Sequence, residues 1–98
     1  MIVITGRVTP KPGAFETLKA EGLAHSARSR GEDGCLSHRC YLDAEVADTL
    51  FFYEEWRDMA AVKAHFAHPD TPRIMAAIRE HAAASEGPVL LAAEPVER

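Results

Sequence analysis

Little in this 98-residue sequence points to nucleic acid, to a membrane or to secretion. Eleven lysines and arginines stand against fifteen aspartates and glutamates, a formal net charge of −4, with no basic cluster. Phosphate binding needs a positive stripe, so we expect no nucleic-acid partner. No apolar run approaches the roughly 20 residues of a membrane span. The apolar run at residues 2–4 is too short for a signal peptide, and we expect a cytoplasmic protein.

Cysteine is also scarce, with only Cys35 and Cys40. Their odd spacing predicts opposite faces of one strand, where the two sulfurs could not easily form a disulfide. Without an export signal, both are expected to be reduced structural thiols. A nucleophilic cysteine would need an activating base beside it. The sequence further lacks a Gly-rich phosphate loop, a G-x-S-x-G elbow and an H-E-x-x-H motif, the signatures of several large enzyme classes.

Five histidines raise the question of a metal. His65 and His68 are three residues apart, a spacing that fits one face of a helix. Pro69 follows directly, however, and no carboxylate or cysteine completes a recognisable set. A zinc site needs three or four convergent ligands, so we predict no metal site.

The hydrophobic pattern predicts the order strand, helix, strand, strand, two helices, strand. Strands are expected at residues 2–9, 35–42, 49–56 and 89–93. Helices are expected from the Pro-Gly break at 10–13 to Ser29, from Asp58 to Phe66, and from Thr71-Pro72 to Gly87. This order is typical of the ferredoxin-like split βαβ arrangement, an α+β fold with a four-stranded antiparallel sheet. We expect a single domain over residues 1–98.

The central strand at residues 49–56 is apolar on both faces. Leu50, Phe52, Glu54 and Trp56 share one face and Phe51, Tyr53 and Glu55 the other, because side chains alternate along a strand. Both faces therefore need covering. Helices of the same chain can cover one face. A second copy of the chain is the simplest cover for the other, which predicts a homodimer through sheet faces.

Helical spacing predicts which residues of the helices face the sheet. Two inward stripes are expected, at Met59, Val62 and Phe66 and at Ile74, Met75 and Ile78. His25 shares helical spacing with Phe15, Leu18 and Gly22, but we expect it at solvent or at a half-buried edge.

The same alternation of side chains along the strands predicts a candidate site in the gap between the sheet and the helices. His38, Glu54 and Trp56 would point into this gap and His65 would reach it from the short helix, with Phe52, Gly6 and Met75 as neighbours. Such a pocket could hold a planar aromatic molecule and accept a proton from a phenol, since histidine titrates near neutral pH. The alternative is structural. Trp56 would plug the core, Glu54 would pair with a cation, His38 would be a hydrogen-bonded core residue, His65 would cap the surface, and Gly6 would relieve crowding by a helix.

Three features together resemble the antibiotic biosynthesis monooxygenase (ABM) family over nearly the whole chain. They are the strand ending in E-x-W, the A-H-x-x-x-P run at residues 64–69, and a following helix with inward Ile and Met. The turn at residues 29–36 is also similar. The resemblance implies a dimeric α+β barrel, in which two ferredoxin-like units pack sheet to sheet. Several members oxidise phenols, quinols or polyketide aromatics with molecular oxygen and without a metal, flavin or other cofactor.

Carried over to this chain, the resemblance places Trp56 and His65 on recurring family positions, and Glu54 also matches. His65 or His38 would act as base, and the substrate would contact Trp56, Glu54, Phe52, Gly6 and Met75. Haem-degrading relatives have asparagine, tryptophan and histidine where this chain has Gly6, His65 and Met75, which argues against haem degradation. A binding module without chemistry and a cofactor-free isomerase remain open.

Overall fold

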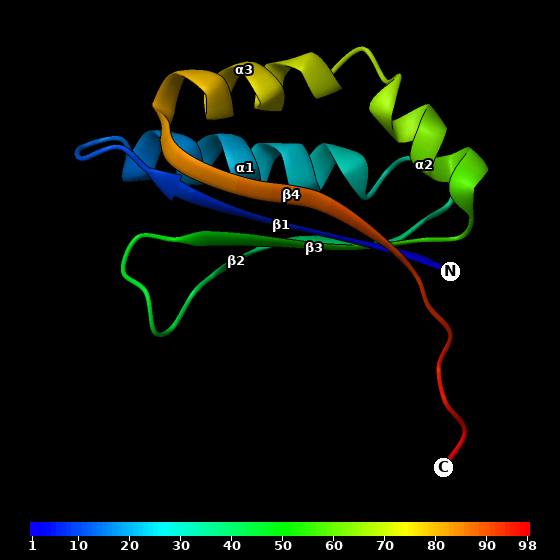
Figure 1. Cartoon of the computed structure of the whole chain (residues 1–98). Helices are drawn as coiled ribbons and strands as arrows, with labels where there is room; N and C mark the ends of the chain where they lie inside the picture. Colours follow the sequence, from blue (N-terminus) through cyan, green and yellow to red (C-terminus); the bar gives the residue numbers. More distant parts are fainter.

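The computed structural model describes residues 1–98 as a four-stranded antiparallel sheet in the order β2-β3-β1-β4, with helices on one side. In chain order the elements are β1 (Ile2–Pro10), α1 (Phe15–Ser29), β2 (Cys35–Leu42), β3 (Leu50–Trp56), α2 (Met59–Phe66), α3 (Thr71–His81) and β4 (Ala82–Ala92). Figure 1 shows α1 and α3 over one face of the sheet and nothing over the other. The predicted ferredoxin-like α+β fold is confirmed. No helix has the length and apolar character needed to cross a membrane.

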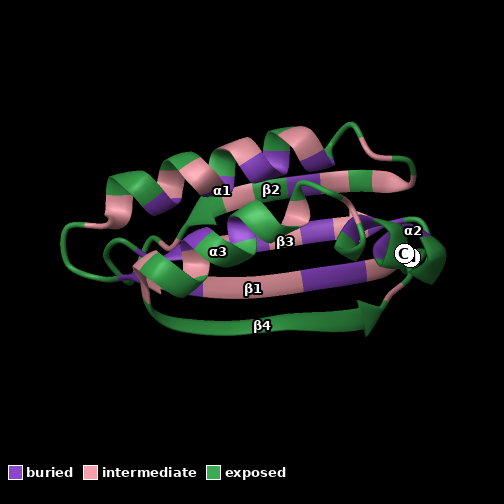
Figure 2. Cartoon of the chain, turned by 90° about the horizontal axis from the view of Figure 1, so that it is seen from above, coloured by how far each residue is buried: buried purple, intermediate pink, exposed green.

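Strand β3 lies in the middle of this arrangement and shows the predicted alternation. Leu50, Phe52, Glu54 and Trp56 are all buried, and the residues between them are half-buried. Figure 2 shows buried segments along β3 and β1, while β4 is exposed along nearly its whole length. The helix-covered face of β3 therefore forms the floor of the core.

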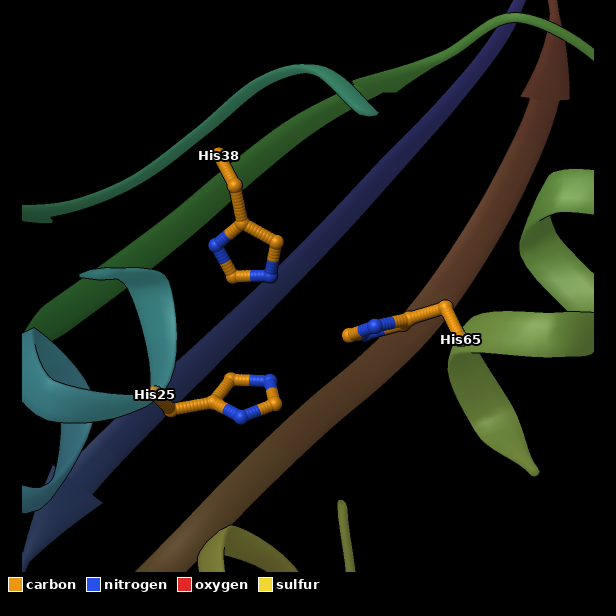
Figure 3. Close-up of side chains that lie close together, drawn as sticks. All are labelled: His25, His38 and His65. Atoms are coloured by element: carbon orange, nitrogen blue, oxygen red, sulfur yellow. The ribbon is translucent and has the colours of Figure 1, made fainter. Parts of the chain in front are cut away.

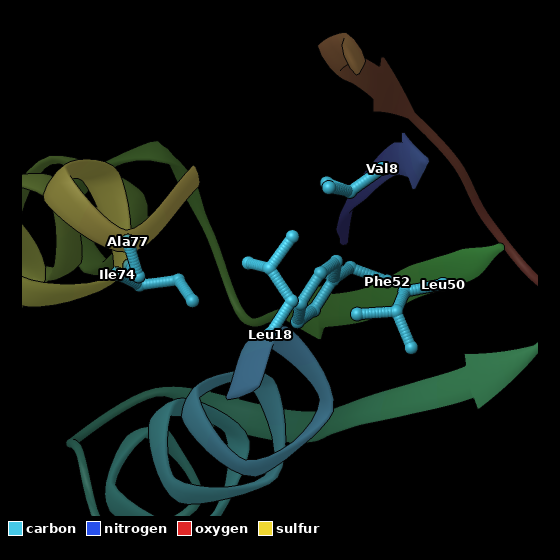
Figure 4. Packing of buried hydrophobic residues seen from close by; sticks show 6 residues of the cluster. All are labelled: Val8, Leu18, Leu50, Phe52, Ile74 and Ala77. Atoms are coloured by element: carbon cyan, nitrogen blue, oxygen red, sulfur yellow. The ribbon is translucent and has the colours of Figure 1, made fainter. Parts of the chain in front are cut away.

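The core has two apolar clusters. The larger joins both central strands to α1 and α3 and consists of Val8, Leu18, Leu50, Phe52, Ile74 and Ala77 (Figure 4). The smaller consists of Ile4, Trp56, Ala61 and Val62 beneath α2. Full burial of a large apolar side chain contributes about 1.5–3 kcal/mol. Helix α1 approaches the sheet closely at Gly22, where a Cβ would lie 3.0 Å from Cζ of Phe52.

Helix α2 begins as predicted but turns a different face inward. The carboxylate of Asp58 accepts the backbone N–H of Ala61 at 2.9 Å, as expected of an N-cap. The buried residues are Ala61, Val62 and His65, whereas Met59 and Phe66 are exposed. The predicted stripe was wrong at these two positions, because this two-turn helix meets the sheet only through the face that carries His65.

The end of α3 was also predicted wrongly. The alanine-rich stretch after His81 is not helix: β4 starts at Ala82 and pairs antiparallel with β1, in the register Pro10 with Ala82 and Thr9 with Ala84. Alanine favours helix only weakly, and ladder hydrogen bonds to β1 override that preference here. In α3 itself Ile74 is buried, but Met75 is 51% exposed, so its predicted inward position was wrong too.

A bulge in β2 changes where the cysteines lie. The register with β3 shifts between Cys35 and Ser37, so that Cys35 packs against the smaller core cluster. Cys40 packs against the larger cluster, and both thiols therefore face the helices. The predicted opposite faces were wrong, because the extra residue of a bulge reverses the parity. Both cysteines are free thiols.

Candidate functional site

A cavity of about 140 Å³ lies between the sheet, α1, α2 and α3. Of the predicted site residues, five line it: Gly6, Phe52, Glu54, His65 and Met75. Met75 reaches it from an exposed position at the rim. His38 and Trp56 are fully buried and do not line the cavity, but both contact Glu54. The lining residues that sequence reasoning missed are Ile4, Thr5, His25, Phe66, Thr71, Ile74, Ile78 and residues 85–88 of β4.

Gly6 is open toward the cavity. It lies where the pairing of β1 with β4 is irregular, between Thr5 and Arg7. A Cβ at this position would meet only the carbonyl oxygen of Glu86, at 3.5 Å, an ordinary contact. Crowding by a helix, one of the two explanations considered for this glycine, is therefore wrong. The close approach occurs instead at Gly87, which has φ +92° and whose Cβ would lie 2.7 Å from the carbonyl oxygen of Thr5.

Glu54 is the centre of a buried polar network. Its Oε1 accepts a hydrogen bond from Nε1 of Trp56 at 2.9 Å. Nε2 of His38 lies 3.3 Å and Nε2 of His65 lies 3.8 Å from the same oxygen. Burial acts to raise the pKa of the Glu54 carboxyl, but the nearby His38 outweighs it, helped by the Trp56 hydrogen bond and the charge of His65, and the pKa is held below its ordinary value. Glu54 is therefore ionised at neutral pH.

Each of the two predicted imidazoles is held by its other ring nitrogen. Nδ1 of His65 lies 3.0 Å from Oε1 of Glu32, and because an ionised carboxylate only accepts, this nitrogen carries the proton. Nδ1 of His38 lies 2.9 Å from the hydroxyl of Ser26. The Nε2 atoms of both rings are thereby turned toward Glu54. The indole of Trp56 lies against the His65 ring, with ring centroids 4.5 Å apart, and fixes it from one side.

His25 is a third imidazole at this place. It is only 7% exposed, so the expectation of a solvent or edge position was wrong. Its ring centroid lies 5.1 Å from that of His38 and 5.4 Å from that of His65, and Figure 3 shows the three rings converging from α1, β2 and α2. Burial, followed by the charges of His38 and His65, lowers the pKa of His25 to about 4, so its ring is neutral at pH 7.

A signal for His25 was present in the sequence. It continues the spacing of Phe15, Leu18 and Gly22, and two of those three residues are buried with it. His68, by contrast, lies outside the cluster, where its Nδ1 accepts the backbone N–H of Asp70. The pair His65 and His68, considered for a metal from the sequence, is thus not the pair that the fold brings together.

The sequence of this chain also matches a known protein family. The model of the family described as "Antibiotic biosynthesis monooxygenase" (ABM) matches residues 1–83. The chain belongs to this family.

Individual proteins are also similar to this chain. The uncharacterized protein sll1783 of Synechocystis sp. is 35% identical over 68 residues, which are 69% of this chain and 46% of that protein. This chain thus spans about half the length of that curated relative. The structure of Rv0793 from Mycobacterium tuberculosis is 27% identical with a TM-score of 0.83, covering 99% of this chain and 96% of that chain. A crystal structure described as an antibiotic biosynthesis monooxygenase is 26% identical with a TM-score of 0.82, covering 97% and 100%.

Proposed function

We propose that this protein is a monooxygenase that oxidises a small phenol or quinol with molecular oxygen and needs no metal, flavin or other cofactor for this reaction. Membership of the ABM family supports a monooxygenase-like role in general. The finer proposal is carried by one observation. His65 lines the cavity while its Nδ1 is held by Glu32, which leaves Nε2 free to take a proton.

The size of the cavity supports a substrate with one aromatic ring. Its volume of about 140 Å³ is close to that of an engineered apolar cavity of about 150 Å³ that binds benzene. Apolar walls from Ile4, Phe52 and Ile74 suit the ring, and Glu54, His25 and His65 are among the polar residues of the lining. A pocket with a few convergent polar groups in apolar walls orients a ligand of this type.

His65 is the proposed general base. In this mechanism its Nε2 accepts the proton of a substrate hydroxyl, and the imidazolium that forms is stabilised by the Glu32 carboxylate at Nδ1. Glu32 is a positioning residue, because it holds the ring and does not line the cavity. His38 is not placed to act as the base directly, since it lies beside Glu54 and outside the cavity lining.

Deprotonation makes the ring electron-rich enough to reduce oxygen. In the simplest balance for a hydroquinone, one ring carbon exchanges its hydrogen for an oxygen atom and the ring is oxidised to a hydroxyquinone. The substrate as a whole loses two hydrogens and gains one oxygen atom, while the second oxygen atom leaves as water: RH₂ + O₂ → RO + H₂O. All four electrons that reduce oxygen come from the substrate. The protein then supplies a dry pocket, an orientation and a base.

Oxygen uptake with a panel of one-ring hydroquinones tests this function. The variant His65→Gln should lose uptake by about 10²–10⁴-fold, the usual contribution of a positioned general base. The matched control His68→Gln removes an imidazole outside the cluster and should keep the full rate. A folded His65→Gln variant with undiminished uptake contradicts the mechanism. Ligand-induced stabilisation without uptake would point instead to a binding module, and a spectral change of the substrate without oxygen to an isomerase.

We further propose that the bare sheet face is covered by a second copy of the chain. By register Tyr41 lies opposite Phe51, Val89 opposite Thr5 and Leu91 opposite Val3, all on the face away from the helices. Tyr41, Val89 and Leu91 are exposed apolar side chains. An uncovered sheet face that exposes several apolar side chains is a candidate protein interface.

Light scattering tests the proposed dimer. The unsubstituted chain should have twice the mass of one chain at micromolar concentration. The double variant Val89→Lys, Leu91→Lys should be monomeric, because it places two charges in the proposed interface. Leu23→Lys is the control, since Leu23 is equally exposed but belongs to α1 in the helical layer. A monomeric unsubstituted chain would rule the sheet-to-sheet dimer out.

A further inference from the structure

We propose that His25, His38 and His65 form a binding site for a divalent first-row transition-metal ion of the zinc class, with Glu54 as the fourth ligand. Each histidine offers one ring nitrogen, and these nitrogens all lie within 4.8 Å of one another. They come from three separate elements, α1, β2 and α2, and point at a common place (Figure 3). All three side chains are buried, the most exposed being His25 at 7%.

The strongest support is an unsatisfied nitrogen in the middle of the cluster. Nε2 of His38 is buried and has no hydrogen-bond partner. Oε1 of Glu54 lies 3.3 Å away, near enough for charge attraction but without the direction of a hydrogen bond. Buried polar atoms of this kind are rare, and a bound ion is one of their ordinary explanations.

The arrangement of protons points the same way. Nδ1 of His65 donates to Glu32, so in the neutral ring the lone pair sits on Nε2, 3.8 Å from Oε1 of Glu54. Nε2 of His65, Nε2 of His38 and Oε1 of Glu54 thus lie close together in the buried centre of the cluster. A metal ion can bind several of these atoms at once.

Outer contacts resemble those that orient metal ligands. A ligating histidine typically donates its second ring nitrogen to a carboxylate, carbonyl or water, and ligating carboxylates are themselves hydrogen-bonded. Here Glu32 holds His65, the Ser26 hydroxyl holds His38, and the Trp56 indole holds Glu54. The two histidines therefore have their Nδ1 held and their Nε2 directed at Oε1 of Glu54, the same oxygen that accepts the indole N–H of Trp56.

The ligand chemistry selects the kind of ion. Imidazole nitrogen suits zinc, cobalt, nickel and copper, whereas magnesium and calcium prefer sites made of oxygen ligands. Zn–N bonds of about 2.0–2.1 Å separate tetrahedral ligand atoms by roughly 3.4 Å. Nitrogens that now lie within 4.8 Å reach this spacing by a contraction of at most roughly 1.4 Å. His25 borders the cavity, so its ring has open space on one side for such a movement.

Metal binding and the proposed oxidation use the same atom. Nε2 of His65 cannot hold a metal ion and accept a substrate proton at the same time. A bound ion is therefore an inhibitor of the proposed reaction. The metal site itself does not depend on that reaction, and its test has a readout without any substrate.

Titration with Co²⁺ is the direct experiment, because tetrahedral cobalt absorbs visible light strongly. We expect one cobalt ion per chain, a tetrahedral spectrum, and displacement by Zn²⁺. His25→Ala and His38→Ala should each weaken binding at least tenfold. The control His81→Ala removes an imidazole outside the cluster and should leave binding unchanged. No tetrahedral spectrum with the unsubstituted chain overturns the proposal, whether or not any variant folds.

Two further variants test the outer contacts, and oxygen uptake tests the link to function. Glu32→Gln and Ser26→Ala should weaken cobalt binding about 10–100-fold, as loss of such partners does at other metal sites. Unchanged affinity in both variants contradicts the assigned geometry.

Oxygen uptake should fall in parallel with the fraction of chains that hold zinc. Full oxygen uptake by a chain fully occupied by zinc would show that His65 is not a ligand. Cobalt binding in a chain that consumes no oxygen supports the metal site and counts only against the proposed oxidation.

Discussion

The hydrogen bond between Trp56 and Glu54 gives the sharpest test of the buried network. Trp56 is completely buried, and its Nε1–H donates to Oε1 of Glu54 at 2.9 Å. Trp56→Phe keeps an aromatic ring but removes the donor. A hydrogen bond to a charged group contributes about 1.5–3 kcal/mol, and the lost indole packing adds roughly 1 kcal/mol. We expect the free energy of unfolding to fall by about 2.5–4 kcal/mol.

A double-mutant cycle separates the hydrogen bond from the packing. Glu54→Gln keeps an acceptor oxygen but makes it neutral, and a neutral hydrogen bond contributes only about 0.5–1.5 kcal/mol. Trp56→Phe should therefore cost about 1–2 kcal/mol less in the Glu54→Gln background. Urea unfolding followed by circular dichroism is the assay, because Trp56 is the only tryptophan and fluorescence would vanish with it.

Tyr53→Phe is the control for this cycle. This variant also removes a hydrogen bond to a carboxylate, the one that the Tyr53 hydroxyl donates to Glu55 at 3.1 Å. That bond lies on the uncovered face of the sheet, where the side chains are half-buried. Its effect should stay within about 0.5 kcal/mol. If Trp56→Phe and Glu54→Gln add within about 0.5 kcal/mol, the two side chains are not coupled. Additivity would refute the account of Glu54 as an ionised residue anchored by the indole.

Three further outcomes follow from single groups. Burial raises the pKa of the Cys40 thiol to about 11, so iodoacetamide at pH 8 should alkylate Cys40 in the folded chain far more slowly than in urea, as read by mass spectrometry. Asp58→Ala removes the cap of α2 and should lower the free energy of unfolding by about 1 kcal/mol in a urea titration. The pKa of Glu54 is lowered in the folded state, so its stabilisation is present above the ordinary value of 4.5 and is lost as the pH falls through the folded value. Acid titrations should therefore show a smaller loss of stability below pH 4.5 for Glu54→Gln than for the unsubstituted chain.

The sequence was most informative where one local rule acted alone. Strict alternation along β3 predicted that Leu50, Phe52, Glu54 and Trp56 face the helices, and all four are buried. A strand in the middle of a sheet has ladder partners on both sides, so its parity cannot change without disrupting two neighbours. The Asp58 cap was equally local, because it depends on a side chain and a backbone N–H three residues apart.

The errors arose where partners distant in sequence decide the structure. Residues 82–84 have helical composition, but β1 holds them as a strand. The bulge after Cys35 could not be seen without the register of β3. Within the candidate site, the alternation along the strands correctly predicted that His38, Glu54 and Trp56 face the helices. It could not tell that Glu54 lines the cavity whereas His38 and Trp56 lie buried behind it. That distinction depends on how α1 and α3 pack, which no local pattern encodes.

His25 was missed for a different reason. Its spacing was correct, but solvent or a half-buried edge was preferred to the interior, as is usual for a polar side chain. A polar side chain is buried when partners accompany it, and those partners, His38 and His65, come from β2 and α2. Periodicity was the better guide here than side-chain polarity.

The two ends of the helix–sheet gap differ in a way that argues for a functional role at one of them. One end is filled by the purely apolar cluster around Leu18 and Phe52, which shows that this chain can close the gap with hydrocarbon alone. The other end buries three imidazoles and a carboxylate, and burying charged or unpartnered polar groups usually stabilises a fold less than apolar residues of the same volume. Proteins accept such a local loss of stability mainly at functional sites. The oxygen-uptake and cobalt experiments therefore ask which function these four residues serve, a proton acceptor or a metal site.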